Sequence, residues 1–424
     1  MFRSEGERHG QSPCRADTRS RSLTIQYRFS RDRPMTGEGT HTATPSQGVV
    51  RARKPSIIMD SSSVIMRASH EWATRPDDQR YVSLDDLKHA VASRKGESWT
   101  ATPAIRDLRV TPAENGNMAV ELYDPTYGGR RTVNPTNWAF GQLAQYAKAP
   151  AAYLRELDPT LAAINVQWGL EHRALRPDAL VLGQTNGDSY LRAMTSTSYG
   201  RIWDAQVVEA VERVNQSGRW QIPASTYGAK NPKRATTLYA SDRDVFIFLV
   251  DPESQIDVGH GRMLHRGFYT WNSEVGSQIF GLCDFLYDFV CDNRMIWGAT
   301  QIRELRIRHT SGAPERFAYE GAKYLTQYAQ ESTADVTAQI HRAQAFEIPK
   351  AAEKNGVEGW LQARGFTGAV AKSAVAAAQA EEGGARSLWD IVNGLTAHAR
   401  TNPHTDERVT LEKQAGKLME IVKA

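Results

Sequence analysis

The sequence has few cysteines and no long apolar run. Three cysteines occur among 424 residues, and they form neither a CxxC pair nor the Cys/His spacing of a zinc site. This pattern excludes a disulfide framework and is typical of a protein in a reducing compartment. The longest run made only of aliphatic and aromatic residues, Val245 to Val250, is far shorter than the roughly 18–20 residues that span a membrane. The sequence therefore predicts a soluble, cytoplasmic protein.

Common catalytic motifs are also missing. Gly259-His260-Gly261 lacks the third glycine of a dinucleotide-binding turn, and Gly416-Lys417-Leu418 lacks the Ser or Thr of a phosphate-binding loop. Neither HExxH nor GxSxG occurs. We therefore expect no cofactor, and a non-catalytic protein more readily than an enzyme.

Positive charge is concentrated near the N-terminus. Residues 1–58 contain 11 Lys and Arg but five Asp and Glu, which leaves 41 basic and 43 acidic residues in the remainder. The body is close to neutral, so its global charge makes no case for a polyanionic partner. Residues 1–58 are rich in Arg, Ser, Thr, Gly and Pro and predict a disordered basic tail. This tail is either an arm that tethers the protein to nucleic acid or the product of a reading frame opened too early. The abrupt onset of organised sequence near Trp72 favours a start at Met59 or Met66.

The body predicts an α+β fold. Hydrophobic residues make up 40% of the chain and charged residues 24%, which is ordinary globular composition. Residues 70–310 predict an α+β core domain with a mainly antiparallel central sheet and packed helices. Residues 311–424 predict a helical C-terminal region.

Helix signals are clear in the first part of the body. Ser83 is suited to cap a helix with the stripe Leu84, Leu87 and Val91. Thr136 to Leu157 predicts two short helices separated at Pro150. They form either a DNA-reading helix-turn-helix or a helical hairpin packed on the sheet. The hairpin is favoured, because the second helix offers only Arg155 for base contacts.

Strand signals concentrate between residues 174 and 310. Asn186-Gly187-Asp188 predicts a hairpin between strands at 179–182 and 190–195, and a helix is expected at 204–216. Residues 245–250 are apolar at every position, as in a strand covered on both faces. Further strands are expected at 267–271, 278–282, 285–290, 295–297 and 303–309. In the last strand Leu305 and Ile307 point to one face and two arginines to the other.

Apolar stripes at helical spacing dominate the end of the chain. They run through 317–328, 336–346, 388–399 and 411–422. Ser387 and Asp390 give the third stripe a start that resembles a capping box. These stripes predict a helical layer or a small bundle.

Two polar segments interrupt the apolar strands, and short polar turns between strands often carry a functional site. They are Asn272-Ser273-Glu274-Val275-Gly276 and Cys291-Asp292-Asn293-Arg294-Met295. Together with Trp138 to Leu143 upstream and Leu388 to Leu418 downstream, they resemble the family called Domain of Unknown Function 932, over most of 70–422. The chain departs from the usual family pattern at Arg294, where a small residue is common. The motif residues are Asn272, Ser273, Glu274, Gly276, Cys291 and Asn293.

The resemblance implies a context more than an activity, because the family has none assigned. It implies a phage, prophage or plasmid-encoded protein in the cytoplasm of a bacterial host. In that context the residues suggest single-stranded DNA binding, or strand annealing in phage recombination. Proteins of this kind use a cationic sheet surface with aromatic stacking platforms, and an annealing protein would form homo-oligomers. Candidate contacts are Arg306, Arg308, Lys230, Lys233, Arg234, Tyr269 and Trp271. The favoured alternatives are a solvated sheet face for the arginines and core packing for the aromatic side chains.

Two other classes stay open. A phage accessory protein that binds a host protein would explain the neutral body, and it predicts a contiguous exposed apolar or aromatic patch. A metal-dependent hydrolase or nuclease would use Asp251, Asp257, His260 and Glu274, with His265 nearby. That class predicts that the carboxylates converge. The alternative for these histidines is an ordinary loop or core position, because no third ligand stands at a recognisable spacing.

Overall fold

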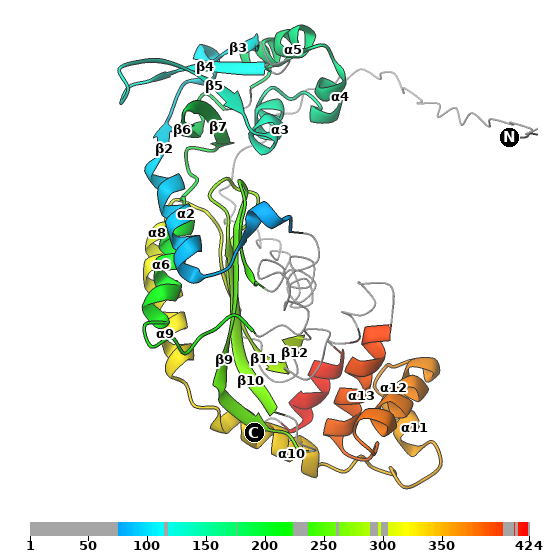
Figure 1. Ribbon diagram of the computed structural model, residues 1–424. Helices are drawn as coiled ribbons and strands as arrows, with labels where there is room; N and C mark the ends of the chain where they lie inside the picture. The colour runs from blue at the N-terminus through cyan, green and yellow to red at the C-terminus, as the bar shows by residue number, and fades with distance from the viewer. Residues whose placement is uncertain are drawn as a thin grey trace, which may run out of the picture. The chain divides into compact units, whose positions relative to one another are not determined.

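The computed structural model describes most of the chain beyond its N-terminal segment (Figure 1). The described residues are 75–113, 118–174, 176–223, 236–259, 263–288, 296–297, 304–401, 411 and 414–422. The basic tail predicted for residues 1–58 lies outside them.

The described strands form two sheets. The large sheet has the order β1-β8-β9-β10-β11-β12, with β13 also paired to β11, and the small sheet has the order β2-β6-β7-β5-β4-β3. The large sheet consists of β1 (Arg80–Tyr81), β8 (Leu238–Ala240), β9 (Val245–Asp257), β10 (Met263–Asn272), β11 (Phe280–Asp288), β12 (Ile296–Trp297) and β13 (Glu304–Ile307). The small sheet consists of β2 (Ser98–Ala101), β3 (Arg109–Pro112), β4 (Met118–Asp124), β5 (Gly129–Pro135), β6 (Leu180–Asn186) and β7 (Asp188–Thr195). Among these pairs β5–β7 alone is parallel. The predicted α+β fold with a mainly antiparallel sheet is confirmed.

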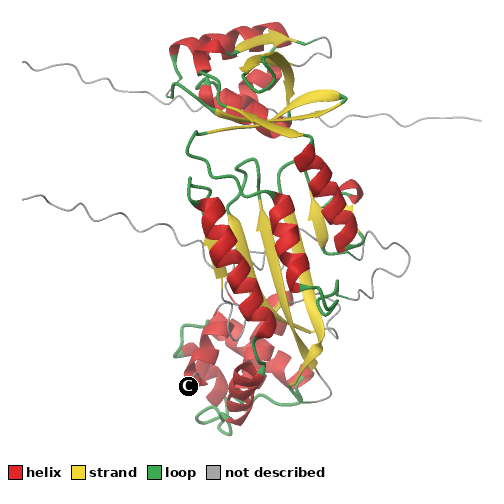
Figure 2. Cartoon of the chain, turned by 90° about the vertical axis from the view of Figure 1, so that its left-hand side faces the viewer, coloured by secondary structure: helices red, strands yellow, loops and turns green. Residues whose placement is uncertain are grey.

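Helices cover one face of the large sheet (Figure 2). They are α2 (Leu84–Gly96), α6 (Asp204–Val214) and α9 (Ala322–Gln330). Val245, Ile247 and Leu249 of β9 point into the core that these helices share with the sheet. The hydroxyl of Ser83 accepts a hydrogen bond from the Asp86 amide at 3.0 Å, which confirms the predicted helix cap.

The opposite face of the large sheet carries a cluster of aromatic side chains. Its buried residues are Tyr239, Phe246, Phe248, Val250, Tyr269, Trp271, Cys283 and Phe285. Neighbouring rings lie nearly parallel, for example Phe248 and Phe285 with centroids 4.6 Å apart. Because both faces are buried, β9 is apolar at every position from 245 to 250, as predicted.

The small sheet is covered by helices on one face only. These helices are α3 (Asn137–Tyr146), α4 (Ala151–Glu156) and α5 (Pro159–His172). Leu143 of α3, Leu154 of α4 and Val166 of α5 belong to the core beneath them. The two helices predicted between 136 and 157 are therefore present, and they pack on a sheet.

The C-terminal helices form a third core. They are α10 (Ala334–Ala345), α11 (Gly356–Gln362), α12 (Gly368–Glu381) and α13 (Leu388–Thr401), and they pack with Ile256 and Leu264 from β9 and β10. The Ser387 hydroxyl accepts from the Asp390 amide, and the Asp390 carboxylate accepts from the Ser387 amide, so α13 begins at the predicted capping box. The preceding segment, α8 (Ala313–Arg316), a π-helical turn (Phe317–Gly321) and α9, packs on the large sheet instead.

Some element predictions were wrong in detail. The strands expected at 278–282 and 285–290 are one strand, β11, because its ladder to β10 continues without a break from Trp271↔Gly281 to Leu264↔Asp288. The predicted hairpin is present as β6 and β7, and it belongs to the small sheet. A turn motif fixes which two strands pair, but it carries no information on which sheet they join.

One glycine in each sheet lies directly under an indole. A Cβ at Gly183 would lie 2.1 Å from the ring of Trp99, and a Cβ at Gly281 would lie 2.0 Å from the ring of Trp271. Both glycines thus make room for a tryptophan on a neighbouring strand.

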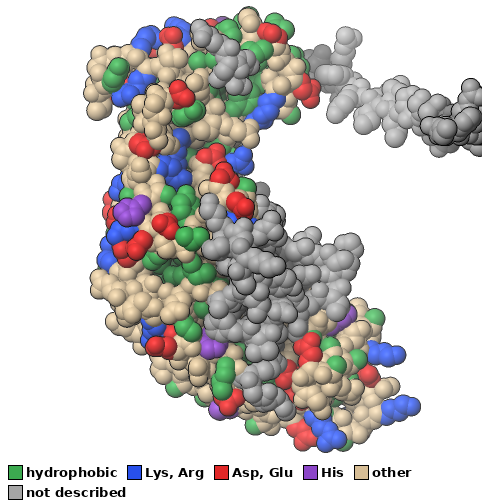
Figure 3. All heavy atoms as spheres, in the orientation of Figure 1, with side chains coloured by type: hydrophobic (Ala, Val, Ile, Leu, Met, Phe, Trp, Pro, Cys, Tyr) green, Lys and Arg blue, Asp and Glu red, His purple; other side chains and the backbone are tan. Residues whose placement is uncertain are grey.

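The described surface carries charges of both signs. On the face drawn in Figure 3, basic and acidic side chains are interspersed without a large area of one sign. No helix within the described part of the chain has the length and apolar character needed to cross a bilayer.

Candidate functional site

The motif Asn272–Gly276 forms a buried polar turn directly after β10. Asn272, Ser273 and Glu274 are almost completely buried. The Asn272 amide donates to the backbone oxygen of Ile202 at 2.8 Å and to Asp204 Oδ1 at 2.7 Å. The first motif residue therefore ties the end of β10 to the start of α6.

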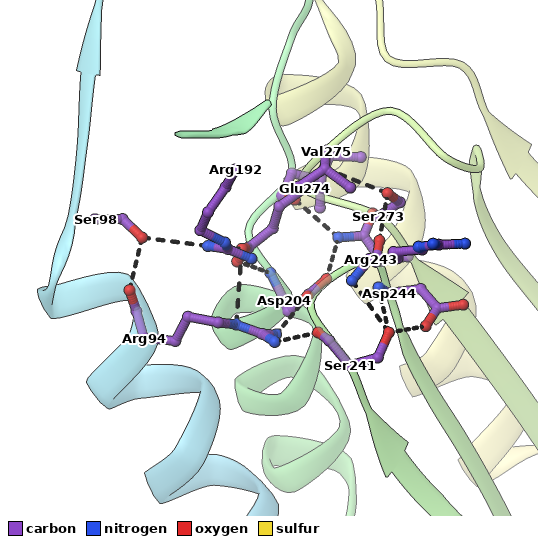
Figure 4. Close-up of polar contacts among 12 residues, drawn as sticks. Arg94, Ser98, Arg192, Asp204, Ser241, Arg243, Asp244, Ser273, Glu274 and Val275 are labelled. Carbon is purple, nitrogen blue, oxygen red and sulfur yellow. Dashed lines mark hydrogen bonds and ion pairs between the residues drawn. The ribbon is translucent and has the colours of Figure 1, made fainter. Parts of the chain in front are cut away.

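Glu274 is the centre of a buried charge cluster (Figure 4). Its Oε2 lies 2.9 Å from Arg192 Nη1 of β7 and 4.0 Å from Arg94 Nε of α2. Its Oε1 accepts a hydrogen bond from the Asp204 amide at 3.0 Å, and its backbone oxygen accepts one from Arg201. One carboxylate, placed just after β10 of the large sheet, thus contacts groups of β7, α2 and α6.

Asp204 is the second acid of this cluster. Its Oδ2 lies 2.8 Å from Arg94 Nη2, and Arg94 also donates to the backbone oxygen of Ser241. Burial and the neighbouring Glu274 raise the pKa of Asp204, while Arg94 acts in the opposite direction. Burial lowers the pKa of Arg192, and it lowers the pKa of Arg201 to about 10. Paired charges removed from water in this way hold their elements together, because separating them would leave a charge without compensation.

Ser273 and Val275 bind further segments through backbone and side-chain atoms. The Ser273 hydroxyl donates to the Arg243 oxygen at 2.7 Å and accepts from the Ser277 amide at 3.0 Å. The Val275 oxygen accepts from the side chains of Trp138 and Gln142 in α3, at 3.0 and 2.8 Å. The motif is therefore a junction that holds α2, α3, α6 and β7 against the end of β10.

Tyr269 and Trp271 do not form an open stacking platform. Their side chains are 0% and 2% exposed, and their rings stack on each other with centroids 5.6 Å apart. The prediction of base stacking was wrong for this strand, because aromatic residues of β9 and β11 stand beside them on the same face.

The predicted basic residues are only partly within the described chain. Arg308 is exposed just after β13, and Arg306 is half-buried in the strand. Leu305 and Ile307 pack into the helix-covered core, so the predicted alternation of this strand is confirmed. Lys230, Lys233, Arg234 and the second motif with Cys291 and Asn293 lie outside the described residues.

The carboxylates of the hydrolase alternative do not converge. Asp251 is buried and pairs with Arg219 at 2.6 Å, and its register partner on β10 is Arg266. Arg266 precedes Glu274 by eight residues, roughly 25 Å of extended chain. Asp257 is exposed, His265 is buried, and His260 lies outside the described residues. Among the residues that the structure describes, no three His, Cys, Asp or Glu side chains are grouped to hold a metal ion.

The uncovered face of the small sheet carries aromatic and basic side chains that sequence reasoning missed. Val110, Val120, Leu122 and Val133 point to the helices and are buried. Between them Arg109, Tyr123 and Arg130 are exposed on the other face, and Tyr123 stands opposite Arg130 in the β4–β5 register. We call Arg109, Thr111, Glu121, Tyr123, Arg130, Thr132 and Tyr190 the open sheet face. In β4, the alternation of Val120 and Leu122 with Glu121 and Tyr123 was the signal that could have revealed it.

Helix α5 carries a second exposed patch. Leu161, Ile164 and Trp168 follow each other at the spacing of one helix face, and each is more than half exposed. Arg173 lies 5.2 Å from the centre of the Trp168 ring. This contiguous patch is the feature expected of a protein-binding module.

Comparison with known proteins identifies a family. The model of the family described as Domain of unknown function (DUF932) matches residues 194–414, which is more than half of the chain. The chain therefore belongs to this family. The match contains Asp204 and Glu274, while Arg94 and Arg192 lie upstream of it. No curated protein and no solved structure matched the chain.

Proposed function

We propose that the protein binds single-stranded nucleic acid, as a DNA-metabolism or strand-annealing protein of a phage or prophage in the cytoplasm of a bacterial host. The observation that carries the proposal is the open sheet face. Tyr123 is 53% exposed and Tyr190 is 38% exposed, and basic side chains stand beside Tyr123 on neighbouring strands.

The chemistry of this face suits unpaired bases. A tyrosine ring exposed on a sheet can stack on any base, and arginines on adjacent strands can pair with the phosphates between the bases. In a duplex the base faces are covered by their neighbours, so the same tyrosines would find no ring to stack on. Single strands are therefore the expected ligand.

The electrostatics favour binding of modest strength. Arg130 lies 3.9 Å from Glu121 on β4, so part of its charge is already compensated. Arg308 adds an exposed cation on the other sheet. Because the open sheet face and the end of β13 each offer few cations, the affinity for nucleic acid should depend strongly on stacking. It should also fall as the salt concentration increases.

The test is fluorescence anisotropy of the full-length protein with single- and double-stranded oligonucleotides of about 30 nucleotides, between about 50 and 200 mM salt. Tyr123→Ala combined with Arg130→Ala should weaken single-strand binding at least about ten-fold, because loss of one stacked base costs about 1–3 kcal/mol. Arg308→Ala measures the contribution of the large sheet separately.

A matched control variant is available. Tyr153 on α4 is 52% exposed and lies on the helical side of the small sheet. Tyr153→Ala combined with Arg173→Ala removes the same two residue types and should leave binding unchanged. No binding at about 50 mM salt, or an equal loss in the control, would overturn the proposal.

The α5 patch supports a second candidate, a host-protein partner. Helices present apolar anchors at i, i+3 and i+7 to grooves of other proteins, which is the spacing of Leu161, Ile164 and Trp168. Ile164→Glu with Trp168→Ala should abolish binding to such a partner and leave oligonucleotide binding intact. Co-purification from host lysate, compared between this variant and the unchanged chain, tests the candidate.

A further inference from the structure

We propose that a pocket beside the Asn272–Gly276 turn binds a small organic anion. The pocket has a volume of about 370 Å³ and lies between α3, the end of β7 and Gly276. This site is separate from the open sheet face, so the proposal does not depend on nucleic-acid binding.

Among the described residues that line the pocket, Arg176 is the one charged group. None of the described residues that line it is acidic. Within the described chain no carboxylate lies within ion-pair distance of Arg176, and its side chain is exposed. A guanidinium without an acidic partner keeps its donors for an anion from solution.

Tyr146 lines the pocket together with Arg176. The hydroxyl of Tyr146 donates to the backbone oxygen of Thr195 at 2.8 Å, which fixes the phenol against the end of β7. Burial raises the pKa of this phenol, and the positive charge of Arg176 acts in the opposite direction. The charge of Arg176 therefore acts at the phenol oxygen inside the pocket.

The walls of the pocket are fixed by the family motif. Gln142 accepts a hydrogen bond from the Met194 amide at 2.9 Å and donates to the Val275 oxygen, so both ends of its amide are occupied. The Tyr199 hydroxyl donates to the Ser273 oxygen at 2.8 Å. These side chains form rigid walls. Gln145 and Ser196 also line the pocket, and the Ser196 hydroxyl shares a hydrogen bond of 3.1 Å with that of Ser198.

Gly276 forms the floor where the turn reverses. Its φ of +79° is a conformation that other residues rarely adopt. A Cβ there would lie 3.5 Å from the Tyr199 ring and 3.7 Å from Gln142, inside the space that the turn leaves open. The same motif thus holds the two sheets together and shapes one side of the pocket.

The chemistry defines the class of ligand. A volume near the lower end of the usual range for ligand pockets fits a metabolite about the size of a nucleotide. The planar fork of an arginine pairs with a carboxylate or a phosphate, and Met194 with the Tyr146 ring offers contact to an apolar body. A carboxylate and a phosphate monoester share this recognition, so both are tested.

The experiment is isothermal titration of the full-length chain with two sets of probes. Adenosine monophosphate and ribose 5-phosphate form the phosphate set, and citrate, glutamate and benzoate form the carboxylate set. At least one probe should bind with a dissociation constant below about 1 mM, and the set that contains it identifies the anion. Arg176→Ala should weaken that binding at least about ten-fold. Arg176→Lys, which replaces the planar guanidinium by an ammonium group, should also weaken it.

Controls separate a binding role from a structural one. Arg173→Ala removes an exposed arginine three positions upstream and should leave the affinity unchanged. Ser196→Trp fills the pocket from its rim and should abolish binding, with the melting temperature checked for each variant. The proposal would be overturned if no probe gave a heat of binding at about 10 mM, or if Arg176→Ala bound the probe with the same affinity as the unchanged chain. Oligonucleotide binding by Arg176→Ala should be unchanged, so failure here is distinguishable from failure of the proposed function.

Discussion

The two sheets use the same residue types in opposite ways. In the large sheet Tyr269 is completely buried, because helices cover one face and stacked rings fill the other. In the small sheet Tyr123 is half exposed, because α3, α4 and α5 cover only the face opposite to it. An aromatic side chain on a strand therefore becomes core or contact surface according to what covers its face, and its identity alone does not decide.

A pair of matched tyrosine variants tests this comparison most directly. Tyr269→Ala should lower the free energy of unfolding by about 3–5 kcal/mol, because it removes a large buried ring and leaves a cavity. Tyr123→Ala should change it by no more than about 0.5 kcal/mol, as expected for an exposed position. Denaturant unfolding followed by circular dichroism measures both. A loss below about 1 kcal/mol for Tyr269→Ala would show that the aromatic face is not core.

The junction between the sheets offers the second test. Glu274→Gln keeps the size of the side chain but removes one carboxylate from the partners of Arg192 and Arg94. We therefore expect the free energy of unfolding to decrease by about 3–5 kcal/mol. Glu212 supplies the control, because it pairs with Lys88 at 2.6 Å on the surface. Glu212→Gln should cost no more than about 1 kcal/mol. Equal losses in the two variants would mean that the buried cluster contributes no more than a surface pair.

His309 makes the junction sensitive to acid. Its imidazole stacks on Tyr199 with centroids 4.9 Å apart, and its Nδ1 lies 3.0 Å from the Gly200 oxygen. Burial lowers the pKa of His309 from 6.5 to about 4. Because the pKa of His309 is lower in the folded state than in the unfolded state, the free energy of unfolding is highest above about pH 6.5 and decreases as the pH falls toward 4. At pH 5 the expected decrease is about 2 kcal/mol.

Thermal or denaturant unfolding between pH 7 and 5 measures this effect. His309→Gln should flatten the pH dependence, since the side chain no longer titrates. His172→Gln, which changes an exposed histidine of α5, serves as the control and should leave the pH dependence as it is in the unchanged chain. A profile that His309→Gln does not alter would assign the acid sensitivity to other groups.

Local signals in the sequence predicted much of the fold. The caps at Ser83 and Ser387, the reversal at Gly187 and the apolar run from 245 to 250 each depend on residues close in sequence, and each appears as expected. The face that a strand presents could also be read, as for Leu305 and Ile307. What these signals leave open is which element covers each face.

The candidate site was less predictable for the same reason. Glu274 stands in a polar segment that the sequence singles out, but its partner Asp204 is 70 residues away and no local pattern joins them. From the sequence, Tyr269 and Trp271 fit either core packing or a stacking platform, and the strands beside them decide for the core. The pocket at Arg176 depends on segments from α3, β7 and the motif turn, so it exists only once the chain has folded.

The glycines under Trp99 and Trp271 have a consequence for the evolution of this chain. At Gly183 and Gly281 the smallest possible substitution, one added methyl group, would have to displace an indole or separate two paired strands. Most positions tolerate such a change, whereas here the lineage can accept it only together with a second change at the tryptophan. These two pairs should therefore be inherited as units, and a relative that has lost the glycine should also have lost its tryptophan.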